Sequence, residues 1–477
     1  MDQTEQAERA TIAVVGAGFS GTLLALHLLQ RSPPHTKVVL IERNAQFGRG
    51  PAYASGNASH LLNVPAARMS AFQQRPLDFL HWLQGLSPEE ACGIETTPTS
   101  FVPRRMFGRY MRHLLNLEMK VPERRDQLIL VRGDVTDIVP DGAGLTLALD
   151  RNRTILAERA VLAIGNFPPA APPVADPSFY DSPAYKADPW AADTMDGLDP
   201  HMPVLLVGTG LTTIDSIVSL LDQGHTGPIT ALSRRGLLPH RHATPGAAPG
   251  ASMPETDSFP TRLNALTRRL RTSAARQMAA GGSWHAVIDE IRPITTELWQ
   301  AMCVRDRQRF LRHLRPWWDT HRHRIAGPVA DRIEAARASG QLRIRAGRIL
   351  DYRQEQADGP VTVTFRPRFS NETDSVTVGR VINCAGPDAD YSRIRDPLVR
   401  SLLEQGLVRP DPLCLGLDVT AHGALLAADG AISRRLFAVG PVTKGAFWEM
   451  TAVPDIRQQA ELLALQLASL VRPPRPA

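Results

Sequence analysis

Short apolar runs alternate with helical apolar patterns along the chain. Residues 11–15 form a mostly apolar run, residues 23–29 place leucines at helical spacing, and residues 38–41 form a second apolar run. A buried strand, a helix and another buried strand in this order are typical of a parallel sheet covered by helices. The pattern therefore predicts an α/β fold.

The turn between the first strand and its helix reads GAGFSG. Gly16 allows the tight turn, Gly18 lets the backbone approach a pyrophosphate, and Gly21 lets the helix pack against the strand. The first helical turn, which includes Ser20, offers backbone amides to the phosphates. Glu42 ends the second strand, 24 residues after Gly18, where a carboxylate binds both ribose hydroxyls. We therefore predict a dinucleotide-binding site at this turn.

A second strand, glycine turn and helix occur in residues 203–221, where the turn reads GTGLTT. Thr213 replaces the third glycine, which weakens the match, although the strand and the helix lie where the motif requires them. The chain is therefore expected to contain two Rossmann-like dinucleotide-binding domains. The nucleotide contacts expected at the second turn are Gly208, Gly210 and Thr212.

The residue after the next strand distinguishes the two sites. Arg234 lies 24 residues after Gly210, the same spacing as Glu42 has from Gly18. An acid binds a free ribose diol, whereas an arginine accommodates a 2′-phosphate. The first site is therefore interpreted as an FAD site and the second as an NAD(P)H site, where Arg234 and Arg235 favour NADPH. An arginine that stacks on the adenine would serve NADH equally well, so both coenzymes remain open.

Further stretches favour FAD at the first site. Residues 48–53, GRGPAY, form a glycine-rich extended stretch that is typical of a segment passing beside a flavin. Residues 160–166, AVLAIGN, resemble the strand and glycine that close the first part of an FAD domain. Residues 436–454 predict a late strand, a glycine and a helix that begins near Asp455, with its positive end near the flavin N1–C2=O edge. The other expected FAD contacts are Arg43, Tyr53, Val135, Gly165, Gly440 and Thr451.

A second closing strand, VINCAGP at residues 381–387, completes an internal duplication in which the second domain is inserted in the first. We predict a first FAD-binding part at residues 1–195, an NAD(P)H-binding domain at 196–386 and a second FAD-binding part at 387–477. A basic helical insertion is expected at about 258–340, and the proline- and glycine-rich stretch 236–260 is expected to be a loop. The arginines of the insertion either form a solvated face or neutralise a nucleotide or an anionic substrate.

Composition narrows the possible partners. The net charge of +6 is spread over 477 residues and comes almost entirely from arginine, so no nucleic-acid partner is expected. No apolar run is long enough to span a membrane, and the polar N-terminus has no signal architecture, so a cytoplasmic protein is expected. The four cysteines lie far apart without a CxxC pair, and no metal site is expected. The oligomeric state is left open.

Four motifs, in their order along the chain, resemble a bacterial family of FAD/NAD(P)-binding flavoproteins with two dinucleotide-binding folds. They are GAGFSG near the start, SRRG after the second glycine turn, RFLRHLRPWW in the basic region and GPVTKGAFWE near the end. Within that family, the chain resembles the FAD-dependent urate hydroxylase type. The resemblance implies a monooxygenase that uses NADH or NADPH and O2 to hydroxylate a small electron-rich heterocycle, with urate to 5-hydroxyisourate in purine catabolism as the first expectation.

An anionic substrate such as urate would be bound by cationic side chains. The candidate substrate contacts are Arg104, Arg105, Lys444 and Trp448. The cofactor carries the redox chemistry, so no catalytic triad is expected. Two alternatives remain: an FAD-dependent NAD(P)H reductase or dehydrogenase of another acceptor, and a flavin-binding protein without turnover.

Overall fold

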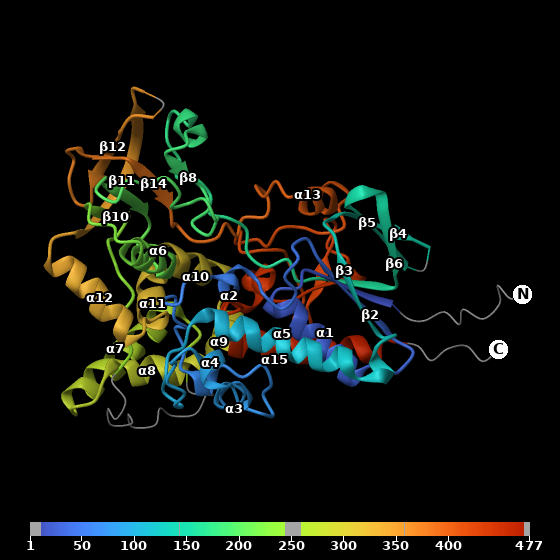
Figure 1. The fold of residues 1–477 in the computed structure, drawn as a ribbon. Helices are drawn as coiled ribbons and strands as arrows, with labels where there is room; N and C mark the ends of the chain where they lie inside the picture. The colour runs from blue at the N-terminus through green and yellow to red at the C-terminus, as the bar shows by residue number, and fades with distance from the viewer. Residues whose placement is uncertain (1–10, 143, 244–258, 357, 472–477) are drawn as a thin grey trace, which may run out of the picture. The chain divides into compact units, whose positions relative to one another are not determined.

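The computed structural model describes residues 11–142, 144–243, 259–356 and 358–471 (Figure 1). The chain forms two compact units, each of which contains its own sheet. Unit 1 comprises residues 1–56, 65–167 and 389–477, and unit 2 comprises residues 57–64 and 168–388. Both units are Rossmann-like α/β folds, as the sequence predicts.

The boundary between the units differs from the expected one. The first FAD-binding part was expected to extend to residue 195, but residues 168–195 belong to unit 2. The physical reason is strand pairing, because β8 (Tyr185–Lys186) pairs in parallel with β14 (Arg380–Asn383). Phe179 and Tyr185 also lie in the hydrophobic core of unit 2.

Unit 1 is built on a six-stranded sheet in the order β15-β16-β7-β1-β2-β3. Strands β16, β7, β1, β2 and β3 run parallel to one another, and the edge strand β15 is antiparallel to β16. Apolar side chains occupy both faces of the central strands, which is why these strands read as continuous apolar runs rather than as alternating patterns. The strand bounds are β1 Thr11–Val15, β2 Lys37–Glu42, β3 Leu128–Arg132, β7 Arg159–Leu162, β15 Ala424–Leu426 and β16 Ile432–Ala438.

Helix α1 (Phe19–Arg31) follows β1 and is buried continuously from Phe19 to Leu29. It packs against α15 (Val453–Ser469) and α5 (Arg104–Lys120), and its apolar character on all sides reflects this position in the interior. The other helices of unit 1 are α2 Pro51–Ala54, η1 Ala66–Arg68, α3 Asp78–Gln84, α4 Pro88–Ala91, η2 Pro122–Arg124, η3 Asp150–Asn152, α13 Pro397–Glu404, η8 Pro441–Thr443 and α14 Lys444–Phe447.

A small antiparallel sheet in unit 1 consists of β4 (Val135–Asp141), β5 (Gly144–Leu149) and β6 (Arg153–Ala157). Along β5 the burial alternates, with Leu145, Leu147 and Leu149 buried. These leucines share a core with Leu398 and Leu402 of α13. This sheet connects β3 to β7 and places residues 133–135 beside the end of β2.

Unit 2 contains a seven-stranded sheet in the order β13-β12-β11-β10-β9-β14-β8. Strands β9, β10 and β14 carry the second nucleotide fold, and β11, β12 and β13 extend the sheet as an antiparallel meander. The remaining strand bounds are β9 Val204–Val207, β10 Ile229–Ser233, β11 Leu342–Gln354, β12 Val361–Pro367 and β13 Asp374–Val378.

Helices occupy most of the described chain between β10 and β11, at the expected insertion. The predicted loop at 236–260 includes residues 244–258, which lie outside the described part. The helices of unit 2 are η4 Ser178–Asp181, α6 Leu211–Asp222, α7 Leu263–Ala279, α8 Trp284–Ile291, η6 Arg292–Ile294, α9 Thr295–Ala301, α10 Val304–Arg309, the π-helix η7 Phe310–Leu314, α11 Arg315–Arg322 and α12 Gly327–Ala338.

Residues 57–64 leave unit 1 and pack within unit 2. His60 Nε2 lies 2.8 Å from Ser219 Oγ on α6, and Asn57 Nδ2 donates a hydrogen bond of 3.0 Å to Asp222 Oδ2. His60 is buried, so this short segment is an integral part of unit 2. Nothing in the apolar pattern predicts this excursion.

Candidate nucleotide-binding sites

The first glycine turn is shaped largely by contacts within unit 1. Gly16 has a φ of +100°, and a Cβ at this position would lie 2.4 Å from the carbonyl oxygen of Ala163. A Cβ on Gly21 would lie 1.8 Å from the carbonyl oxygen of Gly16. Packing within the protein therefore requires glycine at both positions.

Gly18 and Gly165 differ from those two glycines. A Cβ on Gly18 would lie 3.5 Å from Gly50 Cα, which is an ordinary contact, and a Cβ on Gly165 would meet no heavy atom within 4 Å. Packing therefore does not explain Gly18, whereas close approach of a pyrophosphate does. Open space beside Gly165 lies at the carboxyl end of the closing strand β7. The turn thus has the cradle that a bound FAD requires.

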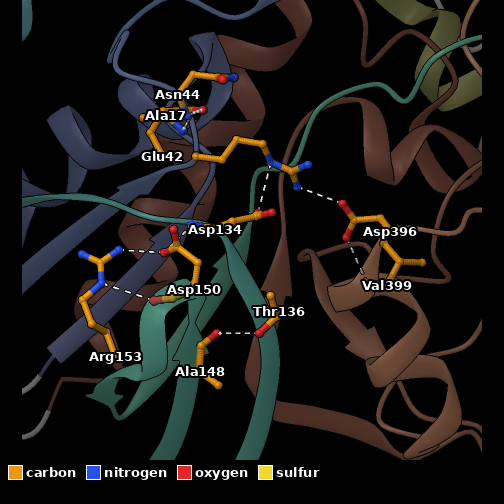
Figure 2. Close-up of polar contacts among 11 residues, drawn as sticks. Ala17, Glu42, Asn44, Asp134, Thr136, Ala148, Asp150, Arg153, Asp396 and Val399 are labelled. Carbon is orange, nitrogen blue, oxygen red and sulfur yellow. Dashed lines mark hydrogen bonds and ion pairs between the residues drawn. The ribbon is translucent and has the colours of Figure 1, made fainter.

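Glu42 lies at the end of β2 and faces the glycine turn (Figure 2). Its Oε2 accepts a hydrogen bond of 2.8 Å from Ala17 N, and its Oε1 accepts one of 3.0 Å from Asn44 N. These bonds fix the carboxylate at the carboxyl edge of the sheet. A nucleotide ribose at the turn would lie within reach of this acceptor.

Arg43 is held between two carboxylates. Its Nε lies 3.2 Å from Asp134 Oδ1, and its Nη2 lies 2.9 Å from Asp396 Oδ2. Asp396 also caps α13 by accepting a hydrogen bond from Val399 N (Figure 2). Burial raises the pKa of Asp134, although the positive charge of Arg43 acts in the opposite direction. The predicted FAD contact Arg43 is therefore neutralised within unit 1.

The segment that contains Tyr53 lies against the glycine turn. Gly48 N donates a hydrogen bond of 2.9 Å to the carbonyl oxygen of Ala17. The Tyr53 ring packs at 4.8 Å from the Phe107 ring, and burial raises the pKa of its phenol to about 12 against the opposing charge of Arg104. Tyr53 is thus a neutral phenol at physiological pH.

The C-terminal return also reaches the glycine turn. Gly440 has a φ of +82°, and a Cβ there would lie 2.4 Å from Ser20 Oγ. Gln459 links this turn to α15, because its Oε1 accepts from Gly440 N at 2.8 Å and its Nε2 donates to Thr443 Oγ1 at 2.9 Å. The helix expected near Asp455 begins at Val453.

The candidate substrate contacts occupy two places in unit 1. Arg104 and Arg105 begin α5, where Arg105 Nη1 donates to the carbonyl oxygen of Gly56 at 3.4 Å. Lys444 Nζ lies 5.0 Å from the centre of the Trp448 ring, and Trp448 is buried with a φ of +58°. Positive φ in a bulky residue is strained and is concentrated at functional sites.

The two remaining predicted FAD contacts, Val135 and Thr451, lie in different segments of unit 1. Val135 is buried at the start of β4 and pairs with Leu149. Thr451 is exposed, and its backbone N donates a hydrogen bond of 2.6 Å to the carbonyl oxygen of Glu449. Glu449 itself is buried, and the sequence analysis did not select it.

The second glycine turn repeats the first at two of its three positions. Gly208 has a φ of +124°, and a Cβ there would lie 2.4 Å from the carbonyl oxygen of Cys384 on the closing strand. A Cβ on Gly210 or on Gly386 would meet no heavy atom within 4 Å. Thr213 is fully buried in α6 in place of the third glycine. The adjoining Thr212 is half-buried near the start of this helix.

Strand register corrects the comparison of the two ribose positions. Val15 pairs with Ile41 in unit 1, and Val207 pairs with Leu232 in unit 2. Equal spacing from the second glycine was therefore the wrong guide, because unit 2 is one residue shorter between its turn and its second strand. The counterpart of Glu42 is Ser233, which follows Leu232.

Hydrogen bonding supports this register. The Ser233 hydroxyl lies 2.8 Å from Thr209 Oγ1 and accepts from Gly236 N at 2.9 Å. Arg234 is then the counterpart of Arg43, and it is exposed. In the described part of the chain, no carboxylate pairs with Arg234. Arg235 Nη2 donates to the carbonyl oxygen of His313 at 3.3 Å.

Residues 13–167 match a protein-family model described as FAD-NAD(P)-binding, over about a third of the chain. No curated protein matches the sequence significantly.

Solved structures share the fold over almost the whole chain. Ornithine hydroxylase from Pseudomonas aeruginosa superposes with a TM-score of 0.66 at 15% identity, covering 96% of this chain and 99% of that one. Cadaverine monooxygenase from Erwinia amylovora gives 0.64 at 11% identity, covering 98% of both chains. Thioredoxin reductase from Lactococcus lactis gives 0.51 at 11% identity, covering 96% and 98%. At these identities the likeness establishes the fold alone.

A redox-active thiol, a metal site and a membrane span would each require particular features of the described residues. Cys92, Cys303 and Cys414 are exposed free thiols, and burial raises the pKa of Cys384 to about 12. Among the described residues, no group of three histidine, cysteine or acidic side chains is arranged to hold a metal ion. Within the same residues, no helix has the length and apolar character needed to cross a bilayer.

Proposed function

We propose that this protein is an FAD-dependent monooxygenase that uses NADPH and O2 to hydroxylate a small molecule. The observation that carries the proposal is the contrast between two similar glycine turns. One turn faces a carboxylate at the ribose position, and the other faces a serine followed by Arg234, which has no carboxylate partner among the described residues. The fold, shared with the hydroxylases from P. aeruginosa and E. amylovora, supports the same activity.

Unit 1 would hold FAD. Glu42 would accept hydrogen bonds from the adenosine ribose, and the start of α1 would bind the pyrophosphate beside Gly18. Bound FAD would supply the redox chemistry by accepting hydride from the coenzyme and activating O2. Tyr53 and the C-terminal return at Gly440 would line the FAD site, because both segments lie beside the glycine turn.

Unit 2 would hold the nicotinamide coenzyme, with NADPH preferred. A carboxylate at Ser233 would repel a 2′-phosphate, whereas the hydroxyl can donate a hydrogen bond to it. Arg234 is exposed and can form a charge-assisted pair with that phosphate. NADH remains the alternative, because an arginine can also stack on the adenine.

The substrate proposal has two forms. Urate is favoured by the sequence resemblance and by the cationic candidates Arg104, Arg105 and Lys444, which suit an anion. An aliphatic amine is favoured by structural neighbours that hydroxylate ornithine or cadaverine. We retain urate, with conversion to 5-hydroxyisourate in purine catabolism, as the first substrate to test.

A reductase of another acceptor is supported by the thioredoxin reductase fold, at the lower TM-score of 0.51. The sequence lacks a CxxC pair, which excludes the usual dithiol relay. A flavin-binding protein without turnover is disfavoured, because it needs no second nucleotide turn.

The deciding experiment uses the purified, flavin-loaded protein. NADPH oxidation, O2 uptake, H2O2 and hydroxylated product would be measured with urate, with ornithine, lysine and cadaverine, and without substrate. A monooxygenase forms hydroxylated product in proportion to NADPH consumed. Oxidation without any hydroxylated product, but with reduction of an added quinone, would establish the reductase instead.

A further inference from the structure

Helix α7 carries two stripes of different character. Leu263, Leu266 and Leu270 recur at helical spacing and contribute to a small hydrophobic core of the insertion. A second stripe follows the spacing i, i+4, i+7 and i+8 but contains polar and cationic side chains. Its members are Asn264, Arg268, Arg271 and Thr272. This spacing places the guanidinium groups of Arg268 and Arg271 on one face of the helix.

This second stripe forms one wall of a groove of about 600 Å³. The other wall carries Arg309, His313 and Leu314. His313 and Leu314 belong to the π-helix η7, a geometry that recurs at functional sites. The groove lies entirely within unit 2 and has the size of a small-ligand site.

The residues that line the groove carry positive charge, and only Arg309 among them has an acidic partner in the described part of the chain. Three arginines and a histidine line it, whereas the described lining includes no acidic side chain. The nearby Asp306 accepts a hydrogen bond from Leu263 N at 3.0 Å and lies 3.4 Å from Arg309. In the described residues, Arg268 and Arg271 have no carboxylate partner. Each of these two arginines, one helical turn apart on α7, can donate charge-assisted hydrogen bonds to an oxyanion.

We propose that this groove binds a phosphate-bearing anion. Arg268 and Arg271 donate to the phosphate oxygens from one wall, and Arg309 adds positive charge from the other. The ligand has two possible sources: the adenosine phosphates of the coenzyme or a free phosphorylated metabolite. The coenzyme is a candidate because Arg235, near the end of β10, donates to the backbone of His313 in the groove wall.

The binding test does not depend on monooxygenase activity. Inorganic pyrophosphate is titrated into the purified holoprotein by calorimetry at low ionic strength. Wild type is compared with Arg268→Gln/Arg271→Gln and with Arg276→Gln, which removes an exposed arginine of α7 outside the groove. The double variant should bind about 100-fold more weakly, at roughly tenfold for each charged hydrogen bond, whereas Arg276→Gln should bind like wild type.

Thermal unfolding of each variant verifies that the fold is retained, and single Arg268→Gln and Arg271→Gln variants replace the double variant if it unfolds. Absence of pyrophosphate binding to wild type, or an equal loss in Arg276→Gln, would overturn the proposal.

Competition identifies the source of the phosphate. Displacement of pyrophosphate by adenosine 2′,5′-bisphosphate or by 5′-AMP would assign the groove to the adenosine phosphates of the coenzyme. If neither nucleotide displaces pyrophosphate, the groove belongs to a separate phosphorylated metabolite. Either result supports an anion site, and failure of NADPH-dependent hydroxylation leaves it unaffected.

Discussion

The two glycine turns share their first glycine and differ where the adenosine ribose would bind. Gly16 and Gly208 each lie close to a carbonyl oxygen at the closing strand of their own unit. A Cβ added to either glycine would lie 2.4 Å from that oxygen. At the end of the next strand, unit 1 has Glu42 and unit 2 has Ser233. Under the proposed assignment, one residue outside the turn would distinguish the FAD site from the coenzyme site.

The arginine after that residue is present in both units, but its surroundings differ. Arg43 is neutralised by Asp134 and Asp396, whereas no acid in the described chain pairs with Arg234. A paired guanidinium has little charge to offer a phosphate. The chemical environment of the arginine therefore distinguishes the two sites better than its presence in the sequence.

The largest expected effect concerns the third position of the turn. Gly21→Ala places a Cβ 1.8 Å from the Gly16 carbonyl oxygen, which should lower the free energy of unfolding by about 3 kcal/mol or more. Thr213→Ala in unit 2 removes side-chain atoms and should cost about 1 kcal/mol. Urea unfolding followed by circular dichroism measures both. Equal losses would show that the two turns pack alike.

The second glycine should control ligand binding rather than folding. Gly18→Val should weaken FAD binding at least about 100-fold, because the valine side chain would clash with the pyrophosphate. A loss of this size corresponds to about 3 kcal/mol of binding free energy. Gly210→Val should keep the flavin and its reduction by dithionite but slow its reduction by NADPH. Flavin content and stopped-flow absorbance provide the measurements. Full flavin occupancy in folded Gly18→Val would refute the FAD site, and flavin loss in Gly210→Val would exchange the two assignments.

Coenzyme preference should depend on Arg234. A charge-assisted arginine–phosphate contact contributes about 1.5–3 kcal/mol, so Arg234→Ala should weaken NADPH binding by roughly 10- to 100-fold. NADH binding should be nearly unchanged, and Ser233→Glu should reproduce the loss by repelling the 2′-phosphate. Stopped-flow reduction with each coenzyme tests this. Equal weakening with both coenzymes would indicate adenine stacking, and no effect on either would remove Arg234 from the site.

The smallest effect is expected at Asp396. Asp396→Asn keeps an oxygen to cap α13 but removes the charge beside Arg43, and should cost no more than about 1 kcal/mol. Asp396→Ala removes the cap as well and should cost about 1–2 kcal/mol. Urea unfolding separates the two variants. A larger cost for Asp396→Asn than for Asp396→Ala would contradict the assigned roles.

Local signals predicted the parts of the fold that depend on neighbouring residues. Both strand–turn–helix elements, both closing strands and the helix near Asp455 follow from apolar spacing and glycine positions. At the second site, the end of the strand is a better reference point than the glycines. When the two strands are aligned by their last apolar residues, Glu42-Arg43 corresponds to Ser233-Arg234. Counting from the glycines assumed connections of equal length.

Features that depend on distant pairing were not predictable in this way. Asp396 meets Arg43 across more than 350 residues, and β8 joins unit 2 through β14. The meander of β11, β12 and β13 also went unpredicted. The first two pairings have no signature within a short window of sequence, whereas the meander joins consecutive strands and is a local feature that the apolar pattern was not used to predict.

The interleaving of the two units has a consequence for biosynthesis. Every segment of unit 2 has been translated once residue 388 is made. The sheet of unit 1 then still lacks β15 and β16. One edge of β7 can pair with β1, but the edge that pairs with β16 has no partner until the ribosome has passed Ala438. The nascent chain therefore carries an open, apolar β-edge in one unit while the other can already be complete. Chaperone dependence during synthesis should accordingly follow unit 1, although unit 1 contains the N-terminus.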